Sequence, residues 1–177
     1  RVRKPVIAAI NGAAVGAGLT WTLQCDLRFV ADDAKLAFAF NRRGVLPELA
    51  SHAILPRLVG MEAALDLLMT GRTFLGEEAA RLGLVSAAVP KDEVLSVAMD
   101  KALELAVYSA PVSMAISKRL VWESLEVPLS ELHRREGELF RWTTQQPDSK
   151  EGTMSFLEKR EPAWTMSVND DYPDWPS

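Results

Sequence analysis

The first part of the chain alternates short apolar runs with turn-forming residues. Residues 6–10, Val-Ile-Ala-Ala-Ile, form a continuous apolar run that is typical of a strand buried on both faces. The pattern predicts further strands over residues 26–31, 35–40 and 84–89, and the start of a buried helix over residues 19–25. Strands and helices that alternate in this way indicate an α/β layer architecture.

From about Leu49 onward the apolar positions follow helical spacing. Two short helices are predicted over residues 61–69 and 76–82, each stopped by a glycine. Four longer helices are predicted over about residues 92–109, 111–125, 129–144 and 148–160. Asp148 is the predicted N-cap of the last one. The tail from Pro162 onward, rich in Pro, Asp and Trp, is predicted to be irregular.

Composition and charge narrow the classes of protein. The chain has 177 residues, 48% apolar and 25% charged, which fits a single globular domain. Its 20 basic and 24 acidic side chains give a net charge of −4, which argues against nucleic-acid binding. Cys25 is the only cysteine, so we expect no intrachain disulfide and a cytoplasmic location.

The uncharged stretch between Lys4 and Asp26 is broken by Asn11 and Gly12, so we expect neither a membrane span nor a signal peptide.

Gly16-Ala17-Gly18 lies between a predicted strand and a predicted helix. Small residues let a ligand approach the backbone, and the first N–H groups of a helix have no partner within it. Such N–H groups can stabilise the oxyanion formed from a thioester carbonyl. The alternative is a tight strand–helix turn packed against its neighbours. The spacing fits neither a phosphate-binding P-loop nor a dinucleotide fingerprint.

Glu48 follows a proline and is predicted to lie in the first turn of a helix. An acidic side chain there favourably meets the helix dipole, which is a purely structural role. The surrounding residues Val45, Leu46, Leu49 and Ala50 indicate a second interpretation, because they would give the carboxylate an apolar setting. A carboxylate in such a setting can move protons at neutral pH.

The other polar residues give weaker evidence for a functional site. His52 falls four residues after Glu48, but no third ligand accompanies the pair, so we expect no metal site and interpret His52 and His133 as structural. The chain has no Gly-x-Ser-x-Gly elbow, and a Ser/His/Asp triad is not indicated. The arginine pair at 42–43 fits either a solvated loop or a phosphate contact. The pair at 134–135, among glutamates, predicts an exposed, ion-paired helix face.

Residues 4–18, Lys-Pro-Val-Ile-Ala-Ala-Ile-Asn-Gly-Ala-Ala-Val-Gly-Ala-Gly, resemble the signature of the crotonase (enoyl-CoA hydratase/isomerase) superfamily. The likeness continues through residues 25–28 (Cys-Asp-Leu-Arg), 55–60 (Leu-Pro-Arg-Leu-Val-Gly), 68–71 (Leu-Met-Thr-Gly), 79–85 (Ala-Ala-Arg-Leu-Gly-Leu-Val) and 151–160. The order and spacing of these motifs fit the family up to about residue 165. The sequence is therefore identified as a member of that family.

The resemblance implies an α/β fold with a crotonase-like spiral of ββα units. Residues 1–90 would form a partial spiral core, and residues 91–177 a helical oligomerisation region that packs homotrimers or hexamers. The resemblance also implies acyl-CoA thioester substrates, with coenzyme A as part of the substrate and no metal or redox cofactor. One N–H group of the family's oxyanion hole would come from Ala17. The other belongs to a segment before residue 1, so we expect the family's N-terminal portion to be missing from this sequence.

Two departures from the family pattern change the expected chemistry. The two-glutamate hydratases of the family would carry their acids at Thr20 and Phe40, and neither residue is acidic. A different subset of the family, which includes 3-enoyl-CoA isomerases, carries its acid at the position of Glu48. The resemblance therefore favours an isomerase with Glu48 as the proton shuttle. The alternatives are a hydratase that uses Glu48 alone and a catalytically silent acyl-CoA-binding or assembly protein.

The resemblance also marks binding residues. We expect four residues to contact the substrate: Gly18, Thr20, Phe40 and Leu46. Phe40 would favour an apolar or aromatic acyl group. Near the C-terminus, Phe156 and Lys159 match family residues that reach the CoA of an adjoining subunit, although simple helix packing explains Phe156 equally well.

Overall fold

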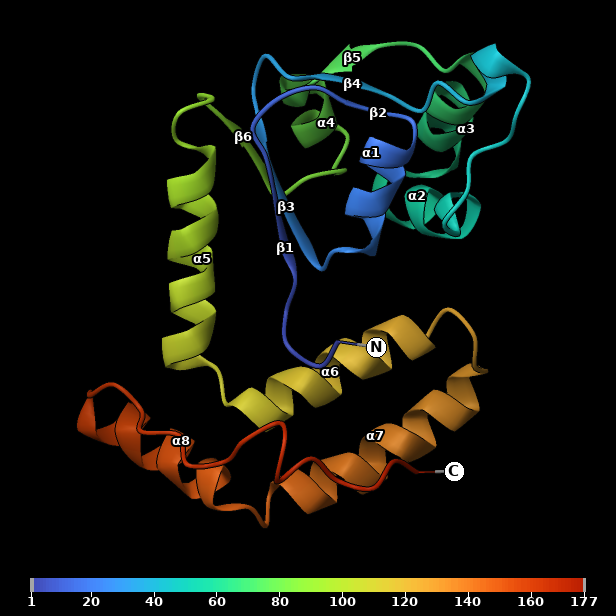
Figure 1. Ribbon diagram of the computed structural model, residues 1–177. Coiled ribbons are helices and arrows are strands. Elements are labelled where there is room, and N and C mark those ends of the chain that lie inside the picture. The colour runs from blue at the N-terminus through green and yellow to red at the C-terminus, as the bar shows by residue number, and fades with distance from the viewer. Residues whose placement is uncertain (1, 177) are drawn as a thin grey trace. The chain divides into compact units, whose positions relative to one another are not determined.

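The computed structural model describes residues 2–176, and the chain divides into two compact units. One unit is Val6–Lys101, and it carries the strands and the first four helices (Figure 1). The other comprises residues 2–5 and 102–176 and is built from helices and an irregular tail. Helix α5 (Val94–Tyr108) runs from the first unit into the second.

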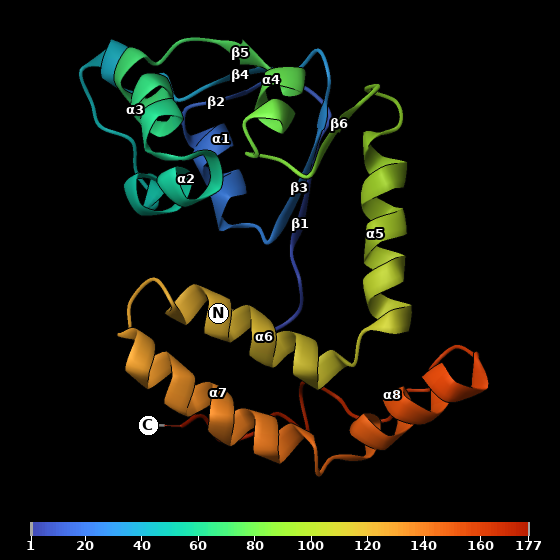
Figure 2. The ribbon, with the colours of Figure 1, turned by 180° about the vertical axis from the view of Figure 1, so that it is seen from behind.

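Two strand–strand–helix repeats form the centre of the first unit (Figures 1 and 2). The first repeat consists of β1 (Ile7–Ile10), β2 (Ala14–Val15) and α1 (Ala17–Thr20), which continues as the 3₁₀ helix η1 (Trp21–Gln24). The second consists of β3 (Leu27–Ala31), β4 (Lys35–Ala37), the 3₁₀ helix η2 (Asn41–Arg43) and α2 (Ser51–Val59). Strand β1 pairs in parallel with β3, and β2 pairs in parallel with β4. The second repeat therefore follows the path of the first one strand further along, which is the ββα arrangement that the family resemblance implies.

Four further elements complete this unit: α3 (Met61–Thr70), β5 (Phe74–Leu75), α4 (Gly76–Arg81) and β6 (Ala87–Val89). Strand β6 extends the first sheet to the order β1-β3-β6, and β5 adds an antiparallel edge to the second, β2-β4-β5. The fully buried side chains of the core include Leu36, Phe38, Leu55 and Leu67. The large aliphatic and aromatic content of these elements supplies the burial that holds the short strands together.

The second unit contains α6 (Pro111–Glu123), α7 (Leu129–Thr143) and α8 (Pro147–Glu158). Helices α6 and α7 lie side by side in both views (Figures 1 and 2). Their core combines Val112, Ala115 and Ile116 of α6 with Leu139 of α7 and Val168 of the tail. The tail forms neither helix nor strand, as predicted, yet it packs on the helices and completes their core.

The helices predicted from apolar spacing over residues 61–69, 76–82, 92–109, 111–125 and 129–144 are confirmed, with ends that differ by one or two residues. The prediction of Asp148 as an N-cap is wrong. Pro147 occupies the first position of α8, so the N-cap falls on Gln146. Asp148 is instead buried in the first turn, and its Oδ1 accepts the N–H of Thr165 at 2.8 Å.

The strands differ more from prediction. In β1 only Ile10 is buried, because the strand lies at the edge of its sheet in the part of the chain described. The strand predicted over residues 35–40 ends at Ala37, and that over 84–89 begins at Ala87. The helix predicted over 19–25 begins at Ala17 and tightens into η1. Strands β2 and β5 were not predicted, since two residues carry no period.

Candidate active site

The turn between β2 and α1 has a backbone that only glycine adopts easily. Gly16 has φ 57° and ψ −125°. Its N–H donates to the carbonyl oxygen of Ala37 at 2.9 Å, and its own carbonyl oxygen accepts the N–H of Thr20 at 3.1 Å. The N–H groups of Ala17 and Gly18 lie in the first turn, where no intrahelical acceptor exists. Both residues are exposed, so their N–H groups are open to an acceptor from outside the turn.

Glu48 lies outside any helix, contrary to the prediction. Helix α2 begins at Ser51, and the two residues before it, Leu49 and Ala50, adopt left-handed φ values of 54° and 53°. Each such residue costs about 1 kcal/mol or more, so contacts from elsewhere must hold the turn. Gln24 of η1 donates its side-chain amide to the carbonyl oxygen of Leu49 at 2.6 Å, and the Ser51 hydroxyl donates to the carbonyl oxygen of Glu48 at 2.6 Å.

The structure brings two predicted site residues into direct contact. The Thr20 hydroxyl donates to Oε1 of Glu48 at 2.7 Å, across 28 positions of the sequence. That distance is in the range of a charge-assisted bond from a hydroxyl to a carboxylate. Thr20 is 0% exposed, whereas Glu48 reaches the surface. The second acceptor near the Thr20 hydroxyl is the carbonyl oxygen of Ala17, at 3.2 Å.

Phe40 lies beyond β4, immediately before η2, and not in a strand as predicted. Its ring lies beside the glycine turn, because a Cβ placed on Gly16 would be 3.9 Å from the ring carbon Cζ. Phe40 therefore lies at the same turn that carries the open N–H groups of Ala17 and Gly18.

The apolar setting that Val45 and Leu46 were expected to give Glu48 is wrong. Val45 is 55% exposed and Leu46 is 71% exposed in the loop between η2 and α2, whereas Pro47, directly before Glu48, is fully buried. Gly18 is exposed in α1 and Leu46 is exposed in this loop, and their substrate contacts stay a prediction.

The structure also locates the weaker candidates His52 and Arg42. His52 lies exposed in α2 and does not share a helix with Glu48. No group of three His, Cys, Asp or Glu side chains within residues 2–176 could hold a metal ion. The Arg42 side chain donates its Nε–H to the carbonyl oxygen of Thr70 at 2.7 Å, so this arginine stabilises the end of α3.

Within residues 2–176, no helix is both long and apolar enough to cross a bilayer.

The ion pairs predicted around residues 134–135 are confirmed, but the prediction of an exposed face holds only for Arg134, which is 42% exposed, whereas Arg135 is 16% exposed. Arg134 pairs with Glu131 and Glu138, and Arg135 pairs with Glu131 and Glu123. Hydrogen bonds from Arg134 and Arg135 lower the pKa of Glu131 to about 2. Because Glu123 belongs to α6, its pair with Arg135 links α6 to α7, and the cluster contains no residue of the candidate site.

The two predicted C-terminal binding residues are both at the surface. Phe156 is 81% exposed on α8, and Lys159 ends the helix in a left-handed conformation with φ 54°. Packing within this chain therefore does not explain Phe156.

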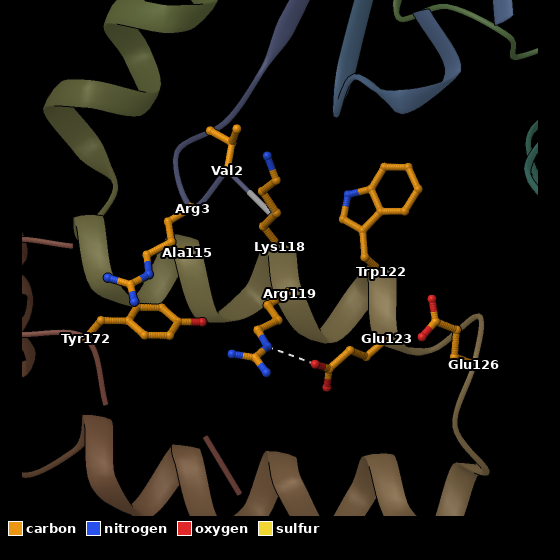
Figure 3. A pocket seen from close by; sticks show the side chains of 9 residues that line it. All are labelled: Val2, Arg3, Ala115, Lys118, Arg119, Trp122, Glu123, Glu126 and Tyr172. Carbon is orange, nitrogen blue, oxygen red and sulfur yellow. Dashed lines mark hydrogen bonds and ion pairs between the residues drawn. The ribbon is translucent and has the colours of Figure 1, made fainter. Parts of the chain in front are cut away.

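A cavity of about 460 Å³ lies in the helical unit, between α6 and the tail (Figure 3). Its lining residues are Val2, Arg3, Ala115, Lys118, Arg119, Trp122, Glu123, Glu126 and Tyr172. The guanidinium of Arg3 lies 4.3 Å from the ring centre of Tyr172, and Arg119 pairs with Glu123 at 2.8 Å. The lining thus mixes charges that already have partners, and it contains no predicted site residue.

The two ββα repeats, with a glycine turn at the head of α1, define a crotonase-fold domain. The sequence profile described as "Enoyl-CoA hydratase/isomerase" matches residues 1–167. A crystal structure of a probable enoyl-CoA hydratase/isomerase from Mycobacterium abscessus is 36% identical, with a TM-score of 0.90 over 94% of this chain and 65% of that one. The chain belongs to the enoyl-CoA hydratase/isomerase family.

Curated relatives agree with this assignment. Enoyl-CoA hydratase ACTT3 of Alternaria alternata is 39% identical over 169 residues, which is 95% of this chain and 57% of the relative. Probable enoyl-CoA hydratase echA8 of Mycobacterium bovis is 38% identical over 164 residues, 93% of this chain and 63% of the relative. The chain thus spans about three fifths of the length of these relatives.

Proposed function

We propose that the protein is an enoyl-CoA isomerase in which Glu48 carries the proton. The observation that supports this most is the hydrogen bond from Thr20 to Glu48, since it joins one acid to the last residue of α1, the helix that begins at Ala17. The acids of a two-glutamate hydratase would stand at positions 20 and 40, which are Thr20 and Phe40. A single carboxylate suits a reaction that removes one proton and gives it back.

The reaction moves one proton and one double bond. Glu48 removes a proton from C2 of a 3-enoyl-CoA, and the electrons of that C–H bond pass into the thioester carbonyl to form a dienolate. The N–H group of Ala17 donates to the thioester oxygen, where the negative charge develops. Glu48 then returns the proton to C4, which leaves the double bond between C2 and C3. No atom is gained or lost, and the reaction requires no metal or redox cofactor.

The rest of the site would bind the thioester. Phe40, beside the turn of α1, would favour an apolar or aromatic acyl group, with Gly18 and Leu46 as further contacts. In a homotrimer or hexamer, Phe156 and Lys159 would reach the CoA bound to a neighbouring subunit. Their exposure at the end of α8 supports this assignment. The single cysteine supports a cytoplasmic location.

A second candidate is an enoyl-CoA hydratase, and the names of the relatives favour it. Both ACTT3 and echA8 are named hydratases. In that reaction Glu48 alone would activate a water molecule and then deliver a proton to C2. Two groups perform these steps more readily than one, so the isomerase is preferred.

The test is product identification with the full-length protein that carries this chain. A 3-enoyl-CoA and a 2-enoyl-CoA are offered separately, and products are identified by mass and chromatography. Conversion of the 3-enoyl to the 2-enoyl compound without a gain in mass supports the isomerase. A gain of one water by the 2-enoyl compound, with no isomerisation, overturns it in favour of the hydratase.

Glu48→Gln tests the assigned base, with Glu62→Gln as the matched control. Glu62 is an exposed glutamate in the first turn of α3. Loss of a general base typically lowers the rate by about 10²–10⁴-fold, so we expect a fall of that size for Glu48→Gln only. No turnover by the unaltered protein, together with acyl-CoA binding that survives Glu48→Ala, would identify a silent acyl-CoA-binding protein instead.

A further inference from the structure

We propose that Thr20 is a positioning residue that fixes which oxygen of Glu48 takes the proton. Its hydroxyl donates to Oε1 at 2.7 Å, and we assign the proton transfer to the other oxygen, Oε2. This assigns Thr20 a role different from the substrate contact that its position predicts, and it rests on the proposed function of Glu48 as the base.

The hydrogen bond between Thr20 and Glu48 is shielded from water and has a defined direction. Thr20 is 0% exposed, so water does not compete for its hydroxyl. A hydroxyl has one proton to donate, and an ionised carboxylate can only accept. The short distance to Oε1, compared with 3.2 Å to the carbonyl oxygen of Ala17, indicates that the proton points to Glu48.

The same hydroxyl links the two halves of the site. Thr20 belongs to α1, whose first residue Ala17 carries the N–H group assigned to the thioester oxygen. Glu48 lies in a loop that reaches the surface, with two left-handed residues directly after it. Gln24 and Ser51 hold the backbone of that loop, whereas the hydrogen bond from Thr20 holds the carboxylate itself. Thr20 thus sets the position of the base relative to the oxyanion donor, and such positioning affects kcat more than substrate affinity.

The test compares Thr20→Val, which keeps the shape and removes the hydroxyl, with Thr20→Ser, which keeps the hydroxyl. Thr22→Val is the matched control. The Thr22 hydroxyl donates to the carbonyl oxygen of Leu19 at 2.7 Å and does not contact Glu48. Each variant is assayed in the full-length protein with whichever enoyl-CoA the unaltered protein converts, and its melting temperature is recorded.

We expect Thr20→Val to lower kcat by about 10- to 100-fold, the range that a hydrogen bond to a charged group supports, with KM changed by less than about threefold. Thr20→Ser restores kcat to within about threefold of the unaltered protein, and Thr22→Val leaves it unchanged. In a Glu48→Gln background, Thr20→Val causes no further loss, because the residue acts through Glu48.

The variant assays distinguish a failure of this inference from a failure of the proposed function. If Glu48→Gln is inactive while Thr20→Val has normal kcat, Thr20 does not position the base and the inference is overturned. If Glu48→Gln is fully active, the proposed function fails first. A crystal structure of Thr20→Val gives a result that does not depend on turnover. A Glu48 carboxylate that moves by more than about 1 Å supports the role of Thr20, and one that stays in place refutes it.

Discussion

Gly76 offers a sharp test of how α4 is docked on the first sheet. The residue begins α4 and is buried against the end of β3. A Cβ added to Gly76 would lie 2.0 Å from the carbonyl oxygen of Ala31, 2.9 Å from its carbonyl carbon and 3.1 Å from Cγ1 of Val30. Two of these three atoms are backbone, so no side chain can rotate away to make room.

The size of the effect follows from the distances. The closest contact is 1.0 Å shorter than the 3.0 Å limit that real Cβ atoms respect, so β3 and α4 must separate by about that amount. The same movement stretches the hydrogen bond from the Glu77 N–H to the Asp32 carbonyl oxygen, now 3.1 Å, beyond bonding range. Overpacking costs about 1–3 kcal/mol and the lost bond about 1 kcal/mol, so Gly76→Ala should destabilise the protein by about 3 kcal/mol.

The assay is thermal unfolding followed by circular dichroism. For a protein of this size, about 3 kcal/mol lowers Tm by roughly 6–12 °C. Gly12→Ala is the matched control, because a Cβ there meets nothing within 4 Å. A Gly76→Ala protein that melts within about 2 °C of the control would refute the close docking of α4 on β3.

Two further predictions concern the turn after Glu48 and the end of α8. Ala50→Gly should raise stability by up to about 1 kcal/mol, since φ 53° strains alanine and not glycine, whereas Ala53→Gly inside α2 should lower it by about as much. If Ala50→Gly and Ala53→Gly lower the melting temperature equally, the backbone of Ala50 is not strained. Hydrogen bonds from Arg160 and from the backbone N–H of Ala163 lower the pKa of Glu151 from 4.5 to about 2. Their stabilisation is therefore present above about pH 4.5 and lost as the pH falls towards 2, so the Tm difference between the unaltered protein and Glu151→Gln should shrink over that range. A difference independent of pH would show that the carboxylate charge contributes nothing.

The elements that could be predicted are those whose signal is local. Helix α3 has an apolar period along its whole length and a glycine, Gly71, that ends it at φ 55°. Helix α6 begins at Pro111, a residue suited to the first helical position. Strand β2, with two residues, contains neither signal, and it exists because Ala14 and Val15 pair with β4.

The geometry of the candidate site could not be predicted from the sequence. The sequence marks Glu48 as an acid after a proline, and nothing local indicates the left-handed pair Leu49 and Ala50 that keeps it out of α2. That turn depends on Gln24, which is 25 residues away from its acceptor in Leu49. The bond from Thr20 to Glu48 spans 28 residues. Such contacts come from the fold, so residue spacing cannot predict them.

Thr20 and Glu48 are best understood as one feature of the candidate site. Their side-chain oxygens are 2.7 Å apart. An acidic side chain in place of Thr20 would put a second negative charge near the Glu48 carboxylate, and like charges close together disfavour the ionised form of both. A neutral donor at position 20 avoids this conflict and satisfies one oxygen of Glu48. An acid at position 48 and a hydroxyl at position 20 therefore support each other, and together they fit chemistry that uses a single carboxylate.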